Sequence, residues 1–189
     1  MLGLAVISAA GICAIKKGVF GKVIKKPDKL YHMTSLENYN SILNDGFIRK
    51  SSADLGNGIS GVFISDMNSL KNKCPESALK RMVNFYRGNS SGKIAILEFD
   101  VSEIGDVSRL KWRPIWLREI PDSGNYQTWN TFDDFTSKRL KHLHKKPLEF
   151  IYPDTIQASK IKSVKIVDVS ALNENRFVEN FWKNIENQK

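Results

Sequence analysis

KLYHMTSLENYNSILNDG, residues 29–46, is the stretch that decides the fold. Its first part, Leu30–Met33, predicts a short strand, because the apolar and aromatic side chains there favour extended backbone. A helix is predicted to follow at once, because Thr34 and Glu37 form a capping box that satisfies free backbone N–H groups. Gly46 is placed to end this helix, since glycine adopts a left-handed turn at little cost.

His32 lies at the end of the predicted strand, just before the helix. Apolar residues recur at helical spacing and predict the helix face that packs back on the strand: Leu36, Tyr39, Ile42 and Leu43. A histidine between a strand end and a packed helix is well placed to bind a ligand. Taken alone, such a histidine is more often structural, so ligand binding depends on other motifs.

Composition indicates one domain with a terminal extension. The chain has 189 residues, 41% of them hydrophobic, which is enough to build an ordinary core. Its 29 Lys and Arg against 20 Asp and Glu give a net charge of +9. This balance favours an acidic partner, such as a nucleic acid, a nucleotide or an anionic membrane, but also suits a lysine-rich soluble protein. Cys13 and Cys74 are too few for a disulfide framework or a zinc site and favour a reducing compartment.

Residues 1–26 form the predicted extension, and residues 27–189 form the predicted domain. Residues 2–15 are apolar, but this run is shorter than the roughly 20 residues that span a bilayer. Lysines then make residues 16–26 basic. The extension fits a targeting or membrane-associated segment, a remnant of a larger secreted precursor, or a helix packed on the domain.

The rest of the chain mixes strand and helix patterns without regular alternation. Strands are predicted at 47–48, 61–65, 93–101, 148–152 and 161–169, with an extended stretch at 110–120. Helices are predicted at 75–87, 131–143 and 174–187, and a polar loop at 51–60. This order predicts an α+β fold with an antiparallel or mixed sheet and flanking helices.

Common catalytic motifs are missing. The sequence has no P-loop, G-x-G-x-x-G, H-E-x-x-H or G-x-S-x-G pattern, so nucleoside-triphosphatase, zincin and serine-nucleophile chemistry have no support. Three segments stand out instead. They are His32 with Thr34, Gly61-Val-Phe-Ile-Ser-Asp66, and Glu149 within Pro147-Leu-Glu-Phe-Ile-Tyr-Pro-Asp154.

These segments, in this order, resemble the motifs of the ADP-ribosyltransferase superfamily. The resemblance is to its His-Tyr-Glu branch, which includes diphtheria toxin and the poly(ADP-ribose) polymerases, and it covers residues 29–169. The first motif is matched by His32, Thr34, Asn38, Ile42, Leu43 and Gly46. The second is matched by residues 61–66, and the third by residues 149–154 with Gln157 downstream.

The resemblance implies a split sheet and a reaction on NAD+ as substrate, without a metal. Glu149 would stabilise the positive charge that develops on the ribose, and His32 would hold the adenosine-side ribose with help from Thr34. The backbone at Gly61, or at Met33 beside the motif histidine, would bind the nicotinamide amide. Phe63 would pack against the nicotinamide ring, and Ser65 would support Glu149.

The chain departs from the family's pattern at positions that bear on the nicotinamide pocket and on the choice of acceptor. Phe63 stands where the branch has tyrosine, and no second tyrosine is found near Cys74. Pro147 lies two residues before Glu149, where the arginine-modifying toxins carry Glu or Gln, so arginine is a poor candidate acceptor. The basic run 138–146 leads directly into Glu149, and Lys145 and Lys146 are predicted to recognise a protein or nucleic-acid acceptor.

We therefore expect a mono-ADP-ribosyltransferase, most consistent with a bacterial toxin or effector that is secreted or delivered and acts in a reducing cytosol. Such a protein would have NAD+, an acceptor and an immunity or antitoxin protein as partners. Two alternatives stay open. One is an RNA-processing enzyme similar to tRNA 2′-phosphotransferase, which needs arginines around a phosphate. The candidate arginines, which fall in no motif, are Arg87, Arg109, Arg113 and Arg118. The other is an inactive module that binds RNA or protein through its basic face.

Overall fold

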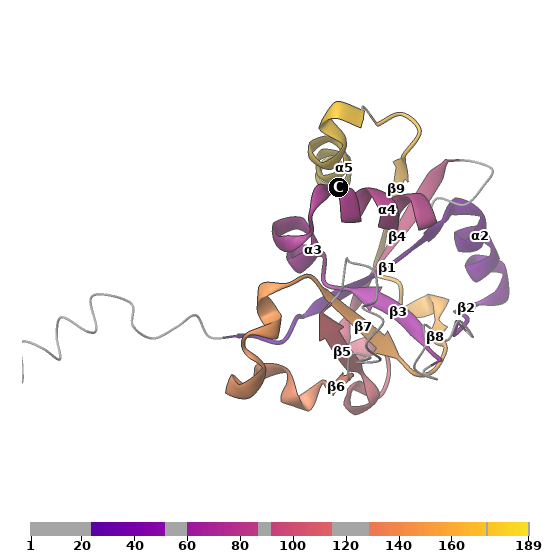
Figure 1. The fold of residues 1–189 in the computed structure, drawn as a ribbon. Coiled ribbons are helices and arrows are strands. Elements are labelled where there is room, and N and C mark those ends of the chain that lie inside the picture. The colour runs from indigo at the N-terminus through magenta and orange to yellow at the C-terminus, as the bar shows by residue number, and fades with distance from the viewer. Residues whose placement is uncertain (1–23, 52–59, 87–91, 115–128, 173, 189) are drawn as a thin grey trace, which may run out of the picture.

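A computed structural model describes residues 24–51, 60–86, 92–114, 129–172 and 174–188 of the chain. A seven-stranded sheet with the order β6-β5-β7-β3-β1-β4-β9 runs through the molecule (Figure 1). Its strands are β1 Lys29–Ser35, β3 Val62–Ser65, β4 Lys93–Asp100, β5 Lys111–Pro114, β6 Asn130–Thr131, β7 Leu148–Tyr152 and β9 Ser163–Asp168. All pairings among the described strands are antiparallel, so the α+β prediction is confirmed and its mixed-sheet option is excluded.

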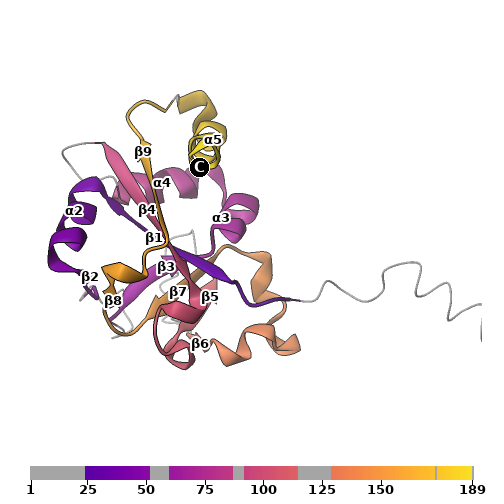
Figure 2. The ribbon, with the colours of Figure 1, turned by 180° about the vertical axis from the view of Figure 1, so that it is seen from behind.

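Helices and short turns cover both faces of this sheet (Figures 1 and 2). The α-helices are α2 Leu36–Asp45, α3 Met67–Lys73, α4 Glu76–Tyr86 and α5 Phe177–Asn187. The 3-10 turns are Val101–Glu103, Val107–Arg109, Asp133–Thr136, Lys138–Leu140, Leu143–Lys145, Ala158–Lys160 and Glu174–Arg176. A second, two-stranded sheet pairs β2 Phe47–Ile48 with β8 Ile156–Gln157.

The main sheet separates two hydrophobic cores. The first core lies on the face that packs against α2, the small sheet and the 3-10 turns. Its large buried side chains are Phe99, Trp112, Phe135 and Phe150. The other face packs against α3, α4 and α5, with the buried side chains Leu70, Leu79, Ile94 and Phe181. Side chains alternate between these faces along each strand, which decides where every candidate site residue lies.

The junction between β1 and α2 forms as a strand followed directly by a helix, but the predicted cap is wrong. Ser35 is the N-cap, and its Oγ accepts a hydrogen bond from the Asn38 backbone N–H at 3.1 Å. Thr34 instead lies in β1, because this strand pairs with β4 as far as Ser35 and Ile94. Gly46 ends the helix as predicted, with φ of 80° and its N–H bonded to the Ile42 carbonyl at 2.9 Å.

The sheet opens between β1 and β3. On its other side, β1 pairs with β4 over seven residues, from Lys29 to Ser35. Toward β3, the only registered pair among the described residues is Tyr31 with Ser65. The strands therefore diverge beyond that pair, and a split of this kind lies between the first and second predicted motifs.

One predicted helix is wrong, and one observed helix was not predicted. The segment 131–143 forms separate 3-10 turns, because Ser137 adopts extended backbone with ψ of 130° and prevents the first turn from continuing as a helix. Helix α3 was not predicted; Asp66 caps it by accepting from the Asn68 N–H at 3.0 Å. Of the extended stretch predicted at 110–120, residues 111–114 form β5, and residues 115–120 lie outside the described residues.

The described chain begins with residues that already contact the domain. Ile24 packs against the first core, and Lys26 Nζ lies 3.4 Å from Asp133 Oδ1 and 4.5 Å from the centre of the Phe132 ring. The apolar run at residues 2–15 lies outside the described residues. Within the described ranges, no helix is long and apolar enough to cross a membrane.

Candidate active site

Polar side chains form one row across six neighbouring strands of the main sheet. Successive registers place these residues side by side on the face that α3, α4 and α5 cover. From β5 to β9 the row reads Arg113, Glu149, Ser65, Tyr31, Glu98 and Ser163. Glu149 and Ser65, predicted to act together, are thus direct cross-strand neighbours at one end of this row.

Arg113 and Glu149 form a half-buried ion pair at that end. Arg113 Nε donates to Glu149 Oε2 at 2.9 Å, and Nη2 lies 2.8 Å from the same oxygen. The two side chains are only 14% and 18% exposed. Burial raises the pKa of Glu149, and the guanidinium opposes that rise. The carboxylate is therefore held in one place, in an environment that penalises its charge.

Aromatic rings lie on one side of Arg113 and within electrostatic reach of Glu149. The Arg113 guanidinium lies 4.2 Å from the centre of the Trp129 ring, and Trp129 lies 6.2 Å from Phe63, centre to centre. Tyr86, at the end of α4, is close enough to feel the charge of Glu149. Burial raises the pKa of Tyr86, and the negative charge of Glu149 adds to this rise, so that the pKa is about 12. A planar, partly apolar ligand would thus meet aromatic side chains next to a carboxylate.

His32 lies on β1, two strands away from Glu149 on β7. Its side chain leaves the sheet on the face opposite to that of Glu149, and its cross-strand neighbour is Leu97. Its Nδ1 is 2.8 Å from the Phe63 carbonyl oxygen, so the ring bridges β1 and β3 where the strands diverge. Burial lowers the pKa of His32 and favours the neutral ring. The structure thus connects His32 to the backbone of Phe63, not directly to Glu149.

The neighbours of His32 on β1 are buried. Met33 belongs to the core beneath α3 and α4, on the same face of the sheet as Phe63 and Ser65. The side chain of Thr34 is on the opposite face, and Thr34 is 5% exposed. Any contact of Met33 with a ligand would therefore use its backbone rather than its side chain.

Gly61 makes a close approach to β7. A Cβ atom at Gly61 would lie 2.5 Å from the Tyr152 carbonyl oxygen and 2.6 Å from Ile151 Cγ1. This position therefore requires glycine for packing between β3 and β7, whatever contact its backbone makes with a ligand.

We expect Gly61→Ala to lower the free energy of unfolding by about 1–3 kcal/mol, because the new methyl group overlaps backbone and core atoms. Urea denaturation would measure the loss. Gly46→Ala is the matched control, because nothing lies within 4 Å of a Cβ atom built there. Only the left-handed backbone of Gly46, with φ of +80°, opposes this change. We expect it to lower the free energy of unfolding by about 1–2 kcal/mol. A Gly61→Ala protein as stable as the parent would contradict the close approach.

Lys145 and Lys146 are exposed at the end of the 3-10 turns that lead into β7. The segment is anchored from both sides. His144 Nε2 lies 2.8 Å from the Phe135 carbonyl oxygen, and Lys73 Nζ from α3 donates to the His144 carbonyl at 2.7 Å.

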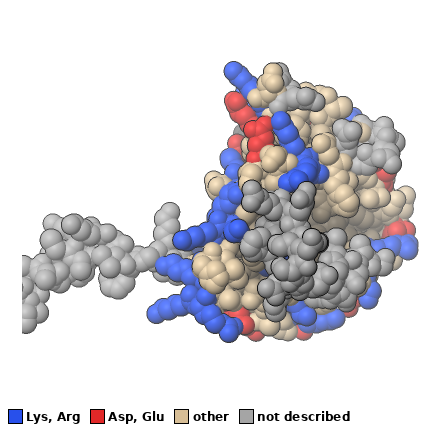
Figure 3. All heavy atoms as spheres, viewed as in Figure 1, with Lys and Arg blue, Asp and Glu red and all other residues tan. Residues whose placement is uncertain are grey.

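We call the exposed cations of this region the basic rim; on the face in Figure 3, Lys and Arg gather on the left side. Its members are Lys26, Lys73, Lys138, Arg139, Lys141, Lys145 and Lys146.

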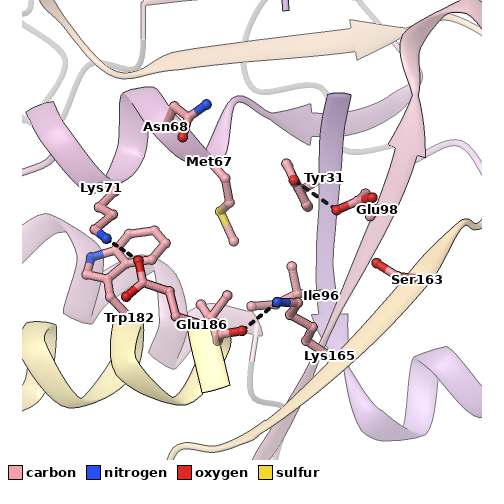
Figure 4. Close-up of a pocket in the computed structure, with 11 residues that line it drawn as sticks. Tyr31, Met67, Asn68, Lys71, Ile96, Glu98, Ser163, Lys165, Trp182 and Glu186 are labelled. Atoms are coloured by element: carbon pink, nitrogen blue, oxygen red, sulfur yellow. Dashed lines mark hydrogen bonds and ion pairs between the residues drawn. The ribbon is translucent and has the colours of Figure 1, made fainter. Parts of the chain in front are cut away.

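A cavity of about 190 Å³ lies at the opposite end of the polar row, beside Tyr31, Glu98 and Ser163 (Figure 4). Most of its charged or hydroxyl groups already have partners: Tyr31 with Glu98 at 3.0 Å, Lys165 with the Ile185 carbonyl at 2.5 Å, and Lys71 with Glu186. Neither Glu149 nor Phe63 lines this cavity. It is therefore separate from the candidate active site.

Sequence reasoning missed Arg113, Trp129 and Tyr86. Arg113 belongs to no motif, and it meets Glu149 only because β5 and β7 pair in one particular register. Trp129 and Tyr86 reach the site from a segment before β6 and from the end of α4. Within the described ranges, no group of three or more His, Cys, Asp or Glu side chains could hold a metal ion.

No family model matches this chain, and no curated protein matches it. Among solved structures, DarT from Thermus sp. 2.9 in complex with NAD+ is 12% identical, over 86% of this chain and 90% of that chain, with a TM-score of 0.46. The same protein with ADP-ribosylated single-stranded DNA has a TM-score of 0.45 at 12% identity, over 87% of this chain and 90% of that chain. A Caulobacter crescentus protein solved by X-ray crystallography is 17% identical, over 76% of this chain and 89% of that chain, with a TM-score of 0.41. These similarities concern the outline of the fold and assign no role to a residue.

Proposed function

We propose that this protein is a mono-ADP-ribosyltransferase that cleaves NAD+ and transfers ADP-ribose to a macromolecule. One observation carries the proposal: the motif glutamate, Glu149, is largely buried and is held by Arg113, whose guanidinium lies over the ring of Trp129. The cross-strand neighbour of Glu149 is Ser65, and the Phe63 carbonyl contacts His32. The three motif segments thus lie on the neighbouring strands β1, β3 and β7, with the side chains of His32 and Glu149 on opposite faces of the sheet.

The chemistry suits a fixed, desolvated carboxylate. Breaking the bond between nicotinamide and C1′ of the ribose leaves the bonding electrons on nicotinamide and positive charge on the sugar ring. Two of the three guanidinium nitrogens of Arg113, Nε and Nη2, contact Oε2 of Glu149. In this scheme Oε1 would accept a hydrogen bond from a ribose hydroxyl. A carboxylate held in this way stabilises the developing charge more than it stabilises the substrate.

The other motif residues would bind NAD+. His32, assisted by Thr34, would hold the adenosine-side ribose through the ring nitrogen that does not contact Phe63. The backbone at Met33 or Gly61 would bind the nicotinamide amide, and the Phe63 ring would pack on nicotinamide. Ser65 would keep Glu149 in place from the neighbouring strand. NAD+ is consumed as a substrate in this scheme.

The acceptor is proposed to approach along the basic rim. This surface continues directly into β7 through Lys145 and Lys146, and contacts of His144 with Phe135 and Lys73 anchor the segment. Exposed cations just before the strand that carries Glu149 suit an anionic macromolecule, either a nucleic acid or an acidic protein surface.

The test is to incubate the protein with NAD+ and, separately, with single-stranded DNA, RNA and a cell extract. We expect nicotinamide to be released and one of these acceptors to gain the mass of one ADP-ribose in the mass spectrum. If nicotinamide is not released with any acceptor, the proposed function is wrong.

Lys145→Glu combined with Lys146→Glu should reduce acceptor modification about tenfold or more and leave NAD+ hydrolysis in water unchanged. The reason is that charge reversal repels an anionic acceptor, and each lost phosphate contact also weakens the dependence on salt. Rates measured at several salt concentrations would show both effects.

The control for this experiment is Lys50→Glu combined with Lys183→Glu, which makes the same change in net charge at two exposed positions outside the basic rim. Equal losses of acceptor modification in both double variants would contradict a specific role of the basic rim.

The alternative resembling tRNA 2′-phosphotransferase receives less support from the structure. Arg109 lies 3.3 Å from Asp154 and Arg113 binds Glu149, so these two arginines pair with separate carboxylates. Arg87 and Arg118 lie outside the described residues. Action as a delivered bacterial toxin or effector, an immunity partner and membrane association through residues 2–15 stay predictions.

A further inference from the structure

The two edges of the main sheet differ in how they present their backbone. At one edge, β6 has only two residues, Asn130 and Thr131. At the other edge, β9 has six residues and pairs with β4 along its length. A long edge strand exposes a row of unpaired N–H and C=O groups, to which another extended chain can add. The edge at β9 is therefore the one that needs protection.

The backbone of Ile166 marks the centre of this exposed edge. In an antiparallel pair, every second residue directs its N–H and C=O groups away from the neighbouring strand. Val169 donates its N–H toward β4, to the Gly92 carbonyl at 2.9 Å, which places Val164, Ile166 and Asp168 on the outward side.

The side chain of Gln188 binds both outward-facing backbone groups of Ile166. Its Oε1 accepts the Ile166 N–H at 2.9 Å, and its Nε2 donates to the Ile166 carbonyl at 2.6 Å. A carboxamide carries one acceptor and one donor group side by side, as a strand residue does, so it satisfies both backbone groups at once. Lys165 Nζ also donates to the Ile185 carbonyl at 2.5 Å, which fastens the end of α5 to β9.

We propose that Gln188 closes the β9 edge against a second copy of this chain. Without its amide, β9 can pair antiparallel with β9 of the second copy, with Ile166 opposite its equivalent. In that register Val164 faces Asp168 and Lys165 faces Val167 of the other copy, so no like charges lie directly opposite each other. Pairing would also cover Val164 and Ile166, which pack against the first core but are partly exposed to solvent.

The test compares the self-association of the full chain and its variants by analytical ultracentrifugation. The parent protein is expected to sediment as a monomer. Gln188→Ala should shift toward twice the monomer mass as concentration rises. Gln188→Glu should shift in the same direction, because a carboxylate cannot donate to the Ile166 carbonyl. Asn187→Ala is the control, since Asn187 is the exposed neighbour of Gln188 on α5.

Hydrogen exchange at the Ile166 amide tells strand pairing from unspecific aggregation. In dilute Gln188→Ala this amide should lose its protection and should regain it in the dimer. Adding Ile166→Pro, which removes the outward N–H, should return the variant to the monomer. The proposal is overturned if Gln188→Ala stays monomeric like the control, if its Ile166 amide stays protected when dilute, or if Ile166→Pro leaves the dimer intact.

Discussion

Glu149→Gln is expected to reduce the rate of nicotinamide release from NAD+ by about 100-fold or more, in line with losing one preorganised electrostatic contact to a developing charge. Glutamine keeps the size of the side chain and still accepts a hydrogen bond from Arg113, but it carries no negative charge. The loss should appear in kcat more than in KM, because the charge on the ribose is largest in the transition state. Steady-state release of nicotinamide at several NAD+ concentrations separates the two constants.

Glu98→Gln is the matched control for this experiment. Glu98 lies in the same polar row, is 15% exposed and is held by Lys29 Nζ at 2.6 Å and the Tyr31 hydroxyl at 3.0 Å. Burial opposes the ionisation of Glu98, but these two bonds and the charges of Lys29 and Lys165 together outweigh burial and lower its pKa. We expect Glu98→Gln to leave nicotinamide release unchanged. If the two variants lose activity equally, or Glu149→Gln loses none, Glu149 is not the catalytic carboxylate.

Arg113→Ala should cut kcat/KM about tenfold or more and move the acid limb of its pH profile to higher pH. Glu149 must be ionised to act, so activity is present above its pKa and falls as pH drops through that pKa. Burial already raises this pKa and Arg113 opposes the rise, so removing the guanidinium raises it further. Rates of nicotinamide release measured across the acid range would show the displacement.

Arg113→Lys separates charge from geometry. Lysine restores a positive charge but not the two nitrogens that contact Oε2, so the acid limb should return toward that of the parent while kcat stays low. Urea unfolding of Arg113→Ala is needed beside the kinetics, because leaving Glu149 unpaired should also cost about 1–3 kcal/mol of stability. An unshifted acid limb in a folded Arg113→Ala protein would contradict the role of Arg113.

Local signals in the sequence were sufficient for several elements. The strand and helix between Lys29 and Gly46 follow from spacing and a terminal glycine, and helix α5 follows from a regular apolar face. The segment after Thr131 shows where such signals fail. Its apolar spacing resembles a helix, yet Phe132, Phe135 and Leu140 reach the core through separate 3-10 turns. The extended backbone at Ser137 separates the turns, and Phe135 packs against Trp112, so tertiary contacts override helix propensity in this short segment.

By itself, the sequence determined the α+β class, because strand and helix patterns depend on residues close together in the chain. Glu149 and His32 are candidates through the resemblance of their motifs, and their roles stay predictions. Only the tertiary structure decided that Arg113 meets Glu149, that β1 and β3 diverge at His32, and that Gln188 covers Ile166. These contacts join residues far apart in sequence. Strand register sets them, and a slip of one residue would turn every side chain to the other face.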